Sequence, residues 1–429
     1  MGLTAPLKEL STANSLPGKL LPWALFALIP ITLLHLYIYP ISVNVESSVR
    51  LKSRASQNGP KGEFDAMPCN YAVGQWVPDV SGPLYSGTSC STIKDGQNCM
   101  AHGRPDTGYL NWRWQPEKCD LPRFDPFAFL GLLRNKHLAF VGDSLARNQL
   151  ESLMCLVATA SDPTLVYRDG EENKFRRWHV LSHNVTVSLF WSPFLVKRIE
   201  KSASSGQNRV YVDAIDERWA SEIPRIDVVV FSIGHWFLTP GIYFEKGSVL
   251  GCHYCPGQNH TEIGFYDVYR KAIKTALKGV AERSSSSSAA AEEEERSRRV
   301  IVTTFSPSHF EGEWDKLGAC GRKEPYGAGE KAVEGMEAEM RKIVVEEASA
   351  IAASRGVRVE VVDVTGLSLL RPDGHPGPYM YKDPFANGVG ERVQNDCVHW
   401  CLPGPVDTWN EIMLELMKRW DPEEKRRRW

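Results

Sequence analysis

Apolar residues along this chain of 429 residues occur in two patterns, short apolar-rich runs and longer stretches with helical spacing. The short runs are typical of buried strands and lie at 137–141, 226–233, 300–305 and 357–364. The helical spacing follows these runs, at 145–158, 264–282, 329–355 and 405–420. Strands that alternate with helices predict an α/β fold with a mostly parallel sheet flanked by helices.

One apolar stretch near the N-terminus has a different character. Residues 20–41 contain no Asp, Glu, Lys or Arg, and a helix of this length, at about 1.5 Å per residue, spans a hydrocarbon core. A cleaved signal peptide is the alternative, but its apolar region is normally shorter and ends in small residues. We expect a transmembrane anchor at 20–41, a cytosolic tail at 1–19 and a polar stem at 42–66. Basic residues on both sides of the anchor do not choose its orientation.

Residues 67–420 then form the large folded part of the chain. Its beginning, from 67 to about 130, is rich in Cys, Gly, Trp and Pro and has little periodicity, which predicts a smaller, loop-rich lobe stapled to the core. The segment 284–299 reads SSSSSAAAEEEERSRR and is expected to be a disordered surface insertion. Residues 421–429 form a short C-terminal tail.

Cysteine usage indicates the compartment. There are ten cysteines, an even number, and all follow the expected anchor. This suits disulfides in an oxidising lumen. Asn184 and Asn259 begin N-glycosylation sequons on the same side of the anchor. We therefore expect the large domain to be luminal, although cysteine spacing alone leaves the pairing open.

Two cysteines three residues apart, Cys252 and Cys255, also have a spacing known from zinc sites. A structural zinc site needs about four ligands, usually from a second such pair, and no second pair is evident. We expect no metal here. Other cofactor signatures are missing as well, since the sequence has no phosphate-binding loop and no dinucleotide fingerprint.

Composition narrows the class of ligand only a little. The chain is 42% hydrophobic and 24% charged, with a net charge of −2. A charge near zero provides no basic field for nucleic acid, while an uncharged ligand such as a glycan is compatible with it.

The most informative stretch is LAFVGDSLARNQ, residues 138–149. An apolar strand pattern ends at Gly142, and a helical pattern begins just after Ser144. A serine at such a turn can present its hydroxyl beside backbone N–H groups that the helix does not use, as acyl transfer requires. The turn differs from the G-x-S-x-G elbow because position 146 is Ala. The alternative is that Ser144 only caps the helix.

A second motif lies near the C-terminus. Asp396 and His399 are three residues apart, so one helical or turn-like segment can place the carboxylate beside the imidazole. Ser, Asp and His in this chain order form a permitted hydrolase-type triad. The imidazole would take the Ser144 proton and the carboxylate would orient the imidazole. The alternative is that Asp396 caps a turn and His399 bonds locally.

Together these motifs resemble those of the plant trichome birefringence-like family of polysaccharide O-acetyltransferases. The matching segments span about residues 67–420 and are CNYAVGQWVPD (69–79), YLNWRWQPEKCDLPRFD (109–125), VGDSLARNQLESLMCL (141–156) and DCVHWCLPGPVDTWNEIML (396–414). Two stretches, 260–273 and 381–410, look most like the altered-xyloglucan branch, which acetylates galactosyl groups of xyloglucan. The resemblance implies an SGNH-esterase-like α/β fold with a smaller added lobe.

The resemblance also implies a disulfide pattern. The implied pairs are Cys69–Cys119, Cys90–Cys155, Cys99–Cys401 and Cys320–Cys397, with Cys252–Cys255 as an extra local pair. Two of these bridges would hold the segment that carries Asp396 and His399, which would help to fix a triad.

Further residues could complete the site. Arg147 and Asn148 lie one turn after Ser144 and could stabilise an oxyanion. Many relatives have Asn where Ser232 stands, so the Gly234 N–H is the expected donor instead. His235 could bind substrate or support its loop.

Two tryptophans adjoin the motifs. Trp236 and Trp400 could stack on sugar rings in a glycan groove. Burial in the core is the alternative for both side chains.

Three functional classes remain at this stage. An O-acetyltransferase would move acetyl from an acetyl-serine to a sugar hydroxyl, an acetylesterase would pass it to water, and a glycan-binding protein would do neither. The family resemblance and the anchor favour transfer, with galactosylated xyloglucan as acceptor, and with xylan or another hemicellulose as the alternative acceptor. The resemblance further implies a single-pass Golgi membrane protein, an acetyl donor such as acetyl-CoA or another carrier, a donor transporter or carrier protein as partner, and no nucleic acid.

Overall fold

The computed structural model describes residues 69–169, 174–200, 206–284, 298–353 and 357–420. The expected tail, anchor and stem, 1–66, lie outside these residues, as do the C-terminal tail and all but the ends of the expected insertion 284–299. Among the helices of the described residues, none has the length and apolar character needed to cross a membrane.

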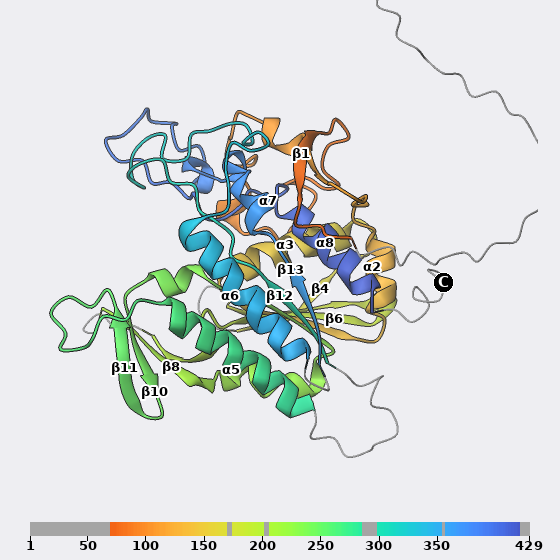
Figure 1. The fold of residues 1–429 in the computed structure, drawn as a ribbon. Helices are drawn as coiled ribbons and strands as arrows, with labels where there is room; N and C mark the ends of the chain where they lie inside the picture. Colours follow the sequence, from red (N-terminus) through yellow and green to blue (C-terminus); the bar gives the residue numbers. More distant parts are fainter. Residues whose placement is uncertain (1–68, 170–173, 201–205, 285–297, 354–356, 421–429) are drawn as a thin grey trace, which may run out of the picture. The chain divides into compact units, whose positions relative to one another are not determined.

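A mixed seven-stranded sheet forms the centre of the molecule (Figure 1). Its strands, in spatial order, are β13 (Val357–Val362), β12 (Arg298–Thr303), β9 (Val228–Ser232), β3 (His137–Gly142), β6 (Val185–Trp191), β5 (Phe175–Val180) and β4 (Thr164–Asp169). The first five run parallel, and β5 pairs antiparallel with both β6 and β4. The predicted, mostly parallel α/β sheet is confirmed, and its antiparallel edge is an addition.

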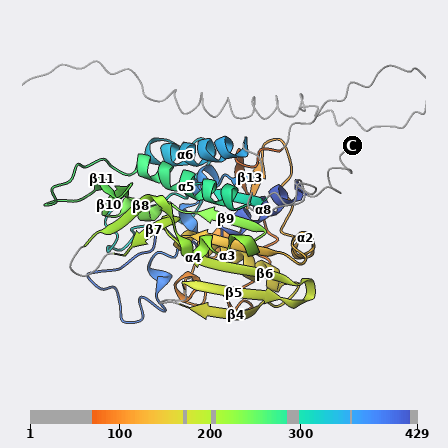
Figure 2. The same ribbon diagram turned by 90° about the horizontal axis from the view of Figure 1, so that it is seen from below.

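Helices cover both faces of this sheet. On one face α3 (Ser144–Ala158) packs beside α8 (Asp407–Lys418), and on the other α5 (Tyr266–Ser284) packs beside α6 (Gly335–Ala352), as Figure 2 shows for α5 and α6. Alternate residues of β3 serve the two faces: Leu138 and Phe140 join the α3 and α8 core, while Ala139 and Val141 join the α5 and α6 core. This alternation explains why the strand reads as one continuous apolar run.

A second, smaller sheet extends from the central one. It has the order β11-β10-β8-β7, with β7 at Val196–Ile199, β8 at Asn208–Ile215, β10 at Gly241–Glu245 and β11 at Ser248–His253. The strands of this sheet are mixed in direction, because β10 pairs parallel with β8 and the other pairs are antiparallel. The sequence pattern did not predict this sheet, since β8 carries exposed charged residues between its apolar positions and β11 has only two buried residues.

The segment before α2 is loop-rich, as predicted. Its only strands among the described residues are β1 (Gly74–Pro78) and β2 (Trp112–Pro116), which form a two-stranded antiparallel sheet. Three disulfides involve this segment, and the implied pairing is confirmed for all ten cysteines: Cys69–Cys119, Cys90–Cys155, Cys99–Cys401, Cys252–Cys255 and Cys320–Cys397. Two of the three bridges tie this lobe to α3 and to the segment just after His399.

The remaining elements are short. The helices are α2 (Pro126–Leu132), α4 (Glu217–Ala220) and α7 (Thr365–Leu369), and the 3-10 helices are η1 (Asp95–Gln97), η2 (Gly108–Leu110), η4 (Leu181–His183), η5 (Ile223–Arg225), η6 (His235–Leu238), η7 (Pro372–Gly374) and η8 (Pro378–Met380).

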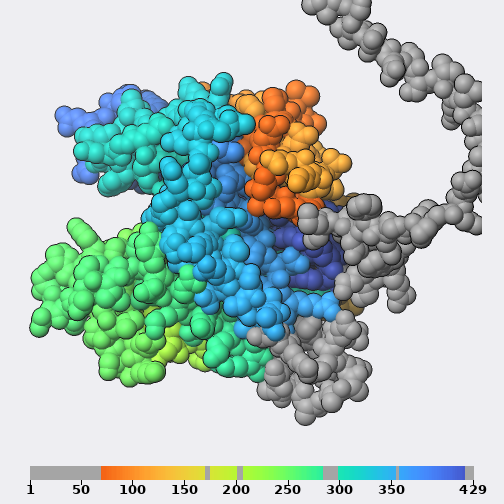
Figure 3. All heavy atoms as spheres, viewed as in Figure 1, coloured from red at the N-terminus to blue at the C-terminus, as the bar shows by residue number. Residues whose placement is uncertain are grey.

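Two groups of chain leave the carboxyl ends of the central parallel strands. The long connection 304–334 follows β12, and η6 with the β10–β11 hairpin follows β9. Figure 3 shows the surface hollowed between these two groups, coloured teal and green. This edge of the sheet is where α/β folds with parallel strands usually bind ligands.

Candidate active site

Ser144 lies at this carboxyl edge because of the way β3 meets β9. The two strands pair in parallel with Gly142 opposite Ser232. A side chain at position 142 would come within 1.9 Å of the Ser232 carbonyl oxygen, so the turn needs glycine there. The chain then passes through Asp143 and starts α3 at Ser144.

Asp143, not Ser144, caps α3. Its Oδ1 accepts the Leu145 N–H at 2.9 Å, and its Oδ2 accepts the Gly234 N–H at 3.0 Å. Burial raises the pKa of Asp143 to about 6, although both N–H groups oppose the shift. The capping alternative for Ser144 is therefore wrong. Among the described residues the Ser144 hydroxyl has no hydrogen-bond partner, and it is partly exposed.

Asp396 and His399 form a tight pair in a turn. Oδ1 of Asp396 accepts the backbone N–H groups of Val398, at 3.0 Å, and of His399, at 2.9 Å. Oδ2 accepts from Nδ1 of the His399 ring at 2.7 Å. Burial works to raise the pKa of Asp396, but the imidazole and these N–H groups outweigh it and hold that pKa well below its ordinary value. One carboxylate thus both caps the turn and orients the imidazole.

The other ring nitrogen of His399 is left as an acceptor. Because Nδ1 donates to Asp396, the neutral ring carries its lone pair on Nε2. Nε2 is buried and has no hydrogen-bond partner in the described part of the chain. No hydrogen bond joins it to Ser144 in this state, and such bonds are often long until a substrate binds. Both atoms of the expected proton transfer are therefore unpaired.

Asn148 fixes α3 to the segment that carries His399. Its Oδ1 accepts the Trp400 N–H at 2.7 Å, and its Nδ2 donates to the Trp400 carbonyl at 3.2 Å. These bonds use the amide oxygen and one N–H of the Asn148 side chain, and its role in stabilising an oxyanion stays a prediction. The pair of bonds places the residue after His399 against the first turn of the Ser144 helix.

A buried histidine pair, which the sequence analysis missed, supports the His399 backbone. Nδ1 of His375 lies 2.6 Å from the His399 carbonyl, its Nε2 lies 2.7 Å from Nδ1 of His309, and Nε2 of His309 lies 2.9 Å from the Leu369 carbonyl. Burial lowers the pKa of both histidines. Three hydrogen bonds here need three ring protons, whereas two neutral imidazoles carry two. Single histidines far apart in sequence gave no signal of this pair.

The remaining oxyanion candidates have different outcomes. Gly234 donates its N–H to Asp143, so the expectation that it stabilises an oxyanion is wrong for this arrangement. A side chain at 234 would also meet Phe305 at 2.5 Å. Arg147 is buried one turn after Ser144, and its guanidinium lies 5.6 Å from the Trp191 ring centroid. Its role in stabilising an oxyanion stays a prediction.

The substrate-binding candidates are mostly structural. Trp400 is fully buried and stacks on His375 at 4.2 Å between ring centroids, so its expected place in a glycan groove is wrong. Nε2 of His235 donates to the Ser306 carbonyl at 2.8 Å, and burial lowers its pKa to about 4, so His235 supports its loop as a neutral ring. Trp236 is partly buried and packs edge to face against Trp191 and Phe194.

Cys252, Cys255 and Glu262 bring their ligand atoms within 4.8 Å of one another, but the two cysteines form a disulfide. Their sulfurs then carry no thiolate charge for a metal. The sequon residues Asn184 and Asn259 are both exposed. Attachment of glycans to them stays a prediction.

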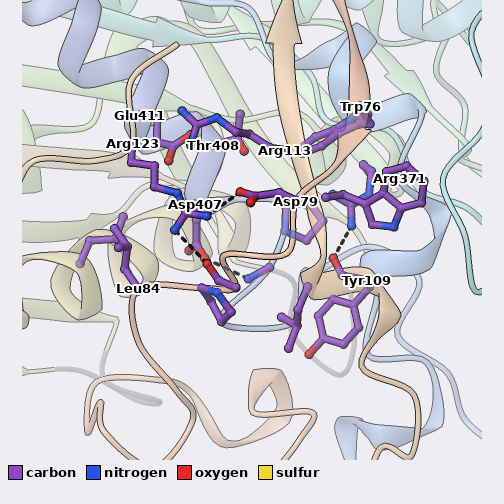
Figure 4. A pocket seen from close by; sticks show the side chains of 17 residues that line it. Trp76, Asp79, Leu84, Tyr109, Arg113, Arg123, Arg371, Asp407, Thr408 and Glu411 are labelled. Atoms are coloured by element: carbon purple, nitrogen blue, oxygen red, sulfur yellow. Dashed lines mark hydrogen bonds and ion pairs between the residues drawn. The ribbon is translucent and has the colours of Figure 1, made fainter.

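A separate small pocket lies away from these residues. It has a volume of about 70 Å³ and lies between the N-terminal lobe and α8 (Figure 4). Arg123 donates to Asp79 at 2.5 Å, and Asp407 accepts from Tyr85 and Ser152 nearby. Burial raises the pKa of Glu411, which lines this pocket, to about 7. The pocket contains none of the triad residues and belongs to the packing of the lobe.

Comparisons with known proteins give the same picture over nearly the whole chain. Residues 121–416 match a GDSL/SGNH-like acyl-esterase family found in Pmr5 and Cas1p, and residues 67–120 match the PMR5 N-terminal domain. The chain is 58% identical to xyloglucan O-acetyltransferase 1 of Populus trichocarpa over 419 residues, and this match covers 96% of this chain and 96% of that protein. It is 54% identical over 418 residues to xyloglucan O-acetyltransferase 1 of Arabidopsis thaliana, covering 94% of this chain and 96% of that protein. It is 42% identical over 388 residues to protein trichome birefringence-like 25 of Arabidopsis thaliana, covering 88% and 81%.

Proposed function

Because this chain belongs to the GDSL/SGNH-like acyl-esterase family found in Pmr5 and Cas1p, and because near-full-length relatives are xyloglucan O-acetyltransferases, we propose that it transfers acetyl groups to xyloglucan. The acceptor is a hydroxyl of the galactosyl side chains. The observation that supports this reaction type is the Asp396–His399 pair, in which the carboxylate orients the ring and Nε2 has no hydrogen-bond partner in the described part of the chain. The segment that carries this pair is hydrogen-bonded to the helix that begins at Ser144.

The reaction proceeds in two half-reactions. In the first, His399 Nε2 takes the Ser144 proton while Oγ attacks the acetyl carbonyl of the donor, and the donor's leaving group departs with that proton. In the second, His399 takes the proton of a sugar hydroxyl, whose oxygen attacks the acetyl-serine. The new sugar ester forms as the bond to Oγ breaks, and Ser144 regains its proton.

Asp396 has a positioning and electrostatic role in both steps. Its bond to Nδ1 keeps the lone pair on Nε2, and its negative charge stabilises the imidazolium that forms. Because its pKa is held well below the ordinary value, Asp396 stays ionised throughout the mildly acidic range. Arg147 lies one turn from Ser144 and supplies positive charge near the oxyanion.

The cellular setting follows from the sequence features. In this proposal the apolar segment 20–41 anchors the protein in the Golgi membrane as a single-pass type II protein, with residues 1–19 cytosolic and the part after the anchor luminal. Five disulfides and exposed sequons support a luminal, oxidising setting. Acetyl-CoA or another acetyl carrier supplies the donor, with a transporter or carrier protein as its source. Removal of glycans from Asn184 and Asn259 should increase gel mobility, and an unglycosylated cytosolic protein would contradict this placement.

The full chain, incubated with an acetyl donor and either galactosylated xyloglucan or xylan oligosaccharides, tests the function. Mass spectrometry should show acetyl gained on xyloglucan galactose and little on xylan, since a site that bonds particular hydroxyls rejects a sugar lacking them by up to about 10⁴-fold. Equal or better acetylation of xylan would discard the xyloglucan assignment. Release of free acetate without any acetylated sugar would instead identify an esterase.

A further inference from the structure

The loop around Trp314 is part of the scaffold that carries Asp396. Backbone N–H groups of Asn395 and Val393 donate to the carbonyls of Trp314 and Asp315, at 3.0 and 2.9 Å. The Asn395 side chain donates to the Trp314 and Lys316 carbonyls, and the disulfide Cys320–Cys397 closes the same pair of segments. The connection after β12 and the segment before the catalytic turn are therefore one unit, seen in teal and blue at the upper left of Figure 1.

This unit exposes aromatic side chains that the core does not use. Trp314 is 51% exposed, Phe310 is 42% exposed and Tyr381 is 50% exposed. Moving a large aromatic ring out of water is favourable, so several exposed rings on one unit indicate a surface that a ligand covers. Phe310, Gly312, Glu313, Trp314 and Asp315 line an open groove of about 600 Å³.

The chemistry of this groove suits a neutral carbohydrate. Ring faces of Phe310 and Trp314 can pack against the C–H faces of sugars. The groove's lining includes two carboxylates and no cationic side chain, so it favours hydroxyl donors over anionic groups such as phosphate or uronate. Asp315 is held by Arg392 at 2.7 Å, which leaves Glu313 as the acceptor for sugar hydroxyls.

The groove is also connected to the reaction centre. Phe310 follows His309, whose backbone N–H donates to the Cys397 carbonyl at 3.0 Å and whose ring contacts His375. His375 in turn contacts the His399 carbonyl at 2.6 Å. The groove and the turn that carries His399 are therefore held by the same hydrogen bonds and the same disulfide, although they are far apart in the sequence.

We propose that the groove formed by Phe310, Glu313 and Trp314 is an acceptor subsite that binds the neutral glucan backbone of xyloglucan while a galactosyl side chain reaches Ser144. This rests on the proposed function for the identity of the ligand. In this proposal the exposed rings of Phe310 and Trp314, and not the buried Trp400, are the sugar-stacking residues.

Binding of galactosylated xyloglucan oligosaccharides by the full chain tests this subsite. Calorimetry in a Ser144→Ala background separates binding from turnover. The dissociation constant should rise about tenfold on adding Trp314→Ala, in keeping with the loss of one aromatic contact, and Trp314→Phe should recover part of it. Phe127→Ala is the matched control, because Phe127 is an exposed ring on α2, before the amino end of β3, and binding should be unchanged.

The outcomes separate this subsite from the proposed function. Unchanged binding in the Trp314→Ala variant, or no binding by the Ser144→Ala parent, overturns the subsite. Transfer assays on the wild type decide the function independently of the subsite. If the Trp314→Ala variant acetylates xyloglucan with the same KM as the wild type, the proposed function stands and the subsite is overturned. A KM raised about tenfold in the variant supports the subsite.

Discussion

At the scale of single residues, two carboxylates divide the work of the candidate site. The Asp143 carboxylate caps α3 by accepting the Leu145 N–H, and it also accepts the Gly234 N–H. The hydroxyl of Ser144, at the first position of the helix, therefore has no hydrogen-bond partner among the described residues. Asp396 satisfies two N–H groups of its turn with one oxygen and orients His399 with the other. A serine that capped its own helix would lose this freedom, because its oxygen would be aimed at the backbone.

Ser144→Ala should abolish transfer and remove any acetyl adduct on the enzyme. The loss should be on the order of 10⁴-fold or more in kcat, as when one member of a triad is removed. The fold should be intact, since the hydroxyl has no partner among the described residues. Mass spectrometry of the intact protein and acceptor assays measure both effects. Ser221→Ala, at an exposed serine after α4, is the control, and near-wild-type transfer by Ser144→Ala would refute the serine mechanism.

His399→Ala should cost nearly as much activity as Ser144→Ala, because the two side chains act as a unit. Asp396→Asn should cost as much or less, up to about 10⁴-fold in kcat, since an amide nitrogen facing Nδ1 favours the wrong tautomer. Steady-state kinetics of the two variants check this. If His399→Ala retained most of the activity, the base would be another residue, and His235 would be the first to test.

At the scale of elements, the site depends on contacts between segments distant in sequence. The side chain of Asn148, on α3, makes two hydrogen bonds to the backbone of Trp400. Cys99–Cys401 and Cys320–Cys397 hold the same segment from both of its ends. The His309–His375 pair adds a hydrogen bond from the His375 ring to the His399 carbonyl. The turn that carries Asp396 and His399 is therefore held by four attachments.

Asn148→Ala should lower kcat by about 100-fold, the cost of displacing a catalytic group by about 1 Å. It should also lower the free energy of unfolding by about 1–3 kcal/mol, because a buried backbone N–H loses its partner. Acceptor kinetics and urea unfolding measure the two effects. Asn111→Ala, at an exposed asparagine after η2, is the control. Full kcat with reduced stability would show that Asn148 serves only the fold.

At the scale of the whole molecule, buried carboxyl groups make stability depend on pH. Burial raises the pKa of Glu411 to about 7 and that of Asp407 to about 6. A raised carboxyl pKa means that the folded state keeps a proton which the unfolded state releases above about pH 4.5. Stability from these groups is therefore greatest in mild acid and falls as the pH rises toward neutral.

Glu411→Gln should remove this dependence at one site. Between pH 5 and pH 8 the wild type should lose on the order of 1–3 kcal/mol more unfolding free energy than the variant. The reason is that Gln carries no charge at either pH, so position 411 of the variant does not titrate. Urea unfolding at the two pH values measures the difference. Glu282→Gln, at an exposed position of α5, should show none. An equal pH dependence in the wild type and in Glu411→Gln would contradict the shift.

The sequence by itself determined the features that depend on local pattern. Short apolar-rich runs gave four of the five parallel strands, since strands of a parallel sheet covered by helices on both faces are rich in apolar residues. The run 226–233 became β9 and the run 357–364 became β13. Ser144, Asp396 and His399 could be proposed as a triad from the sequence because their spacing and chain order match a known signature. The β5–β4 edge and the second sheet gave no such pattern, because their exposed faces mix charged and apolar residues.

Only the tertiary structure decided what the polar atoms near these motifs do. The structure placed the Trp400 backbone against the Asn148 side chain and the Asp143 carboxylate against the Gly234 N–H, and nothing in the sequence pattern indicated either contact. Trp400 could have lined a groove, but it stacks on a histidine 25 positions earlier in the chain. Hydrogen-bond partners and burial come from long-range contacts, which no local pattern records. For the same physical reason, only the structure showed that Phe310 and Trp314 are exposed on a segment hydrogen-bonded to the one that carries Asp396 and His399.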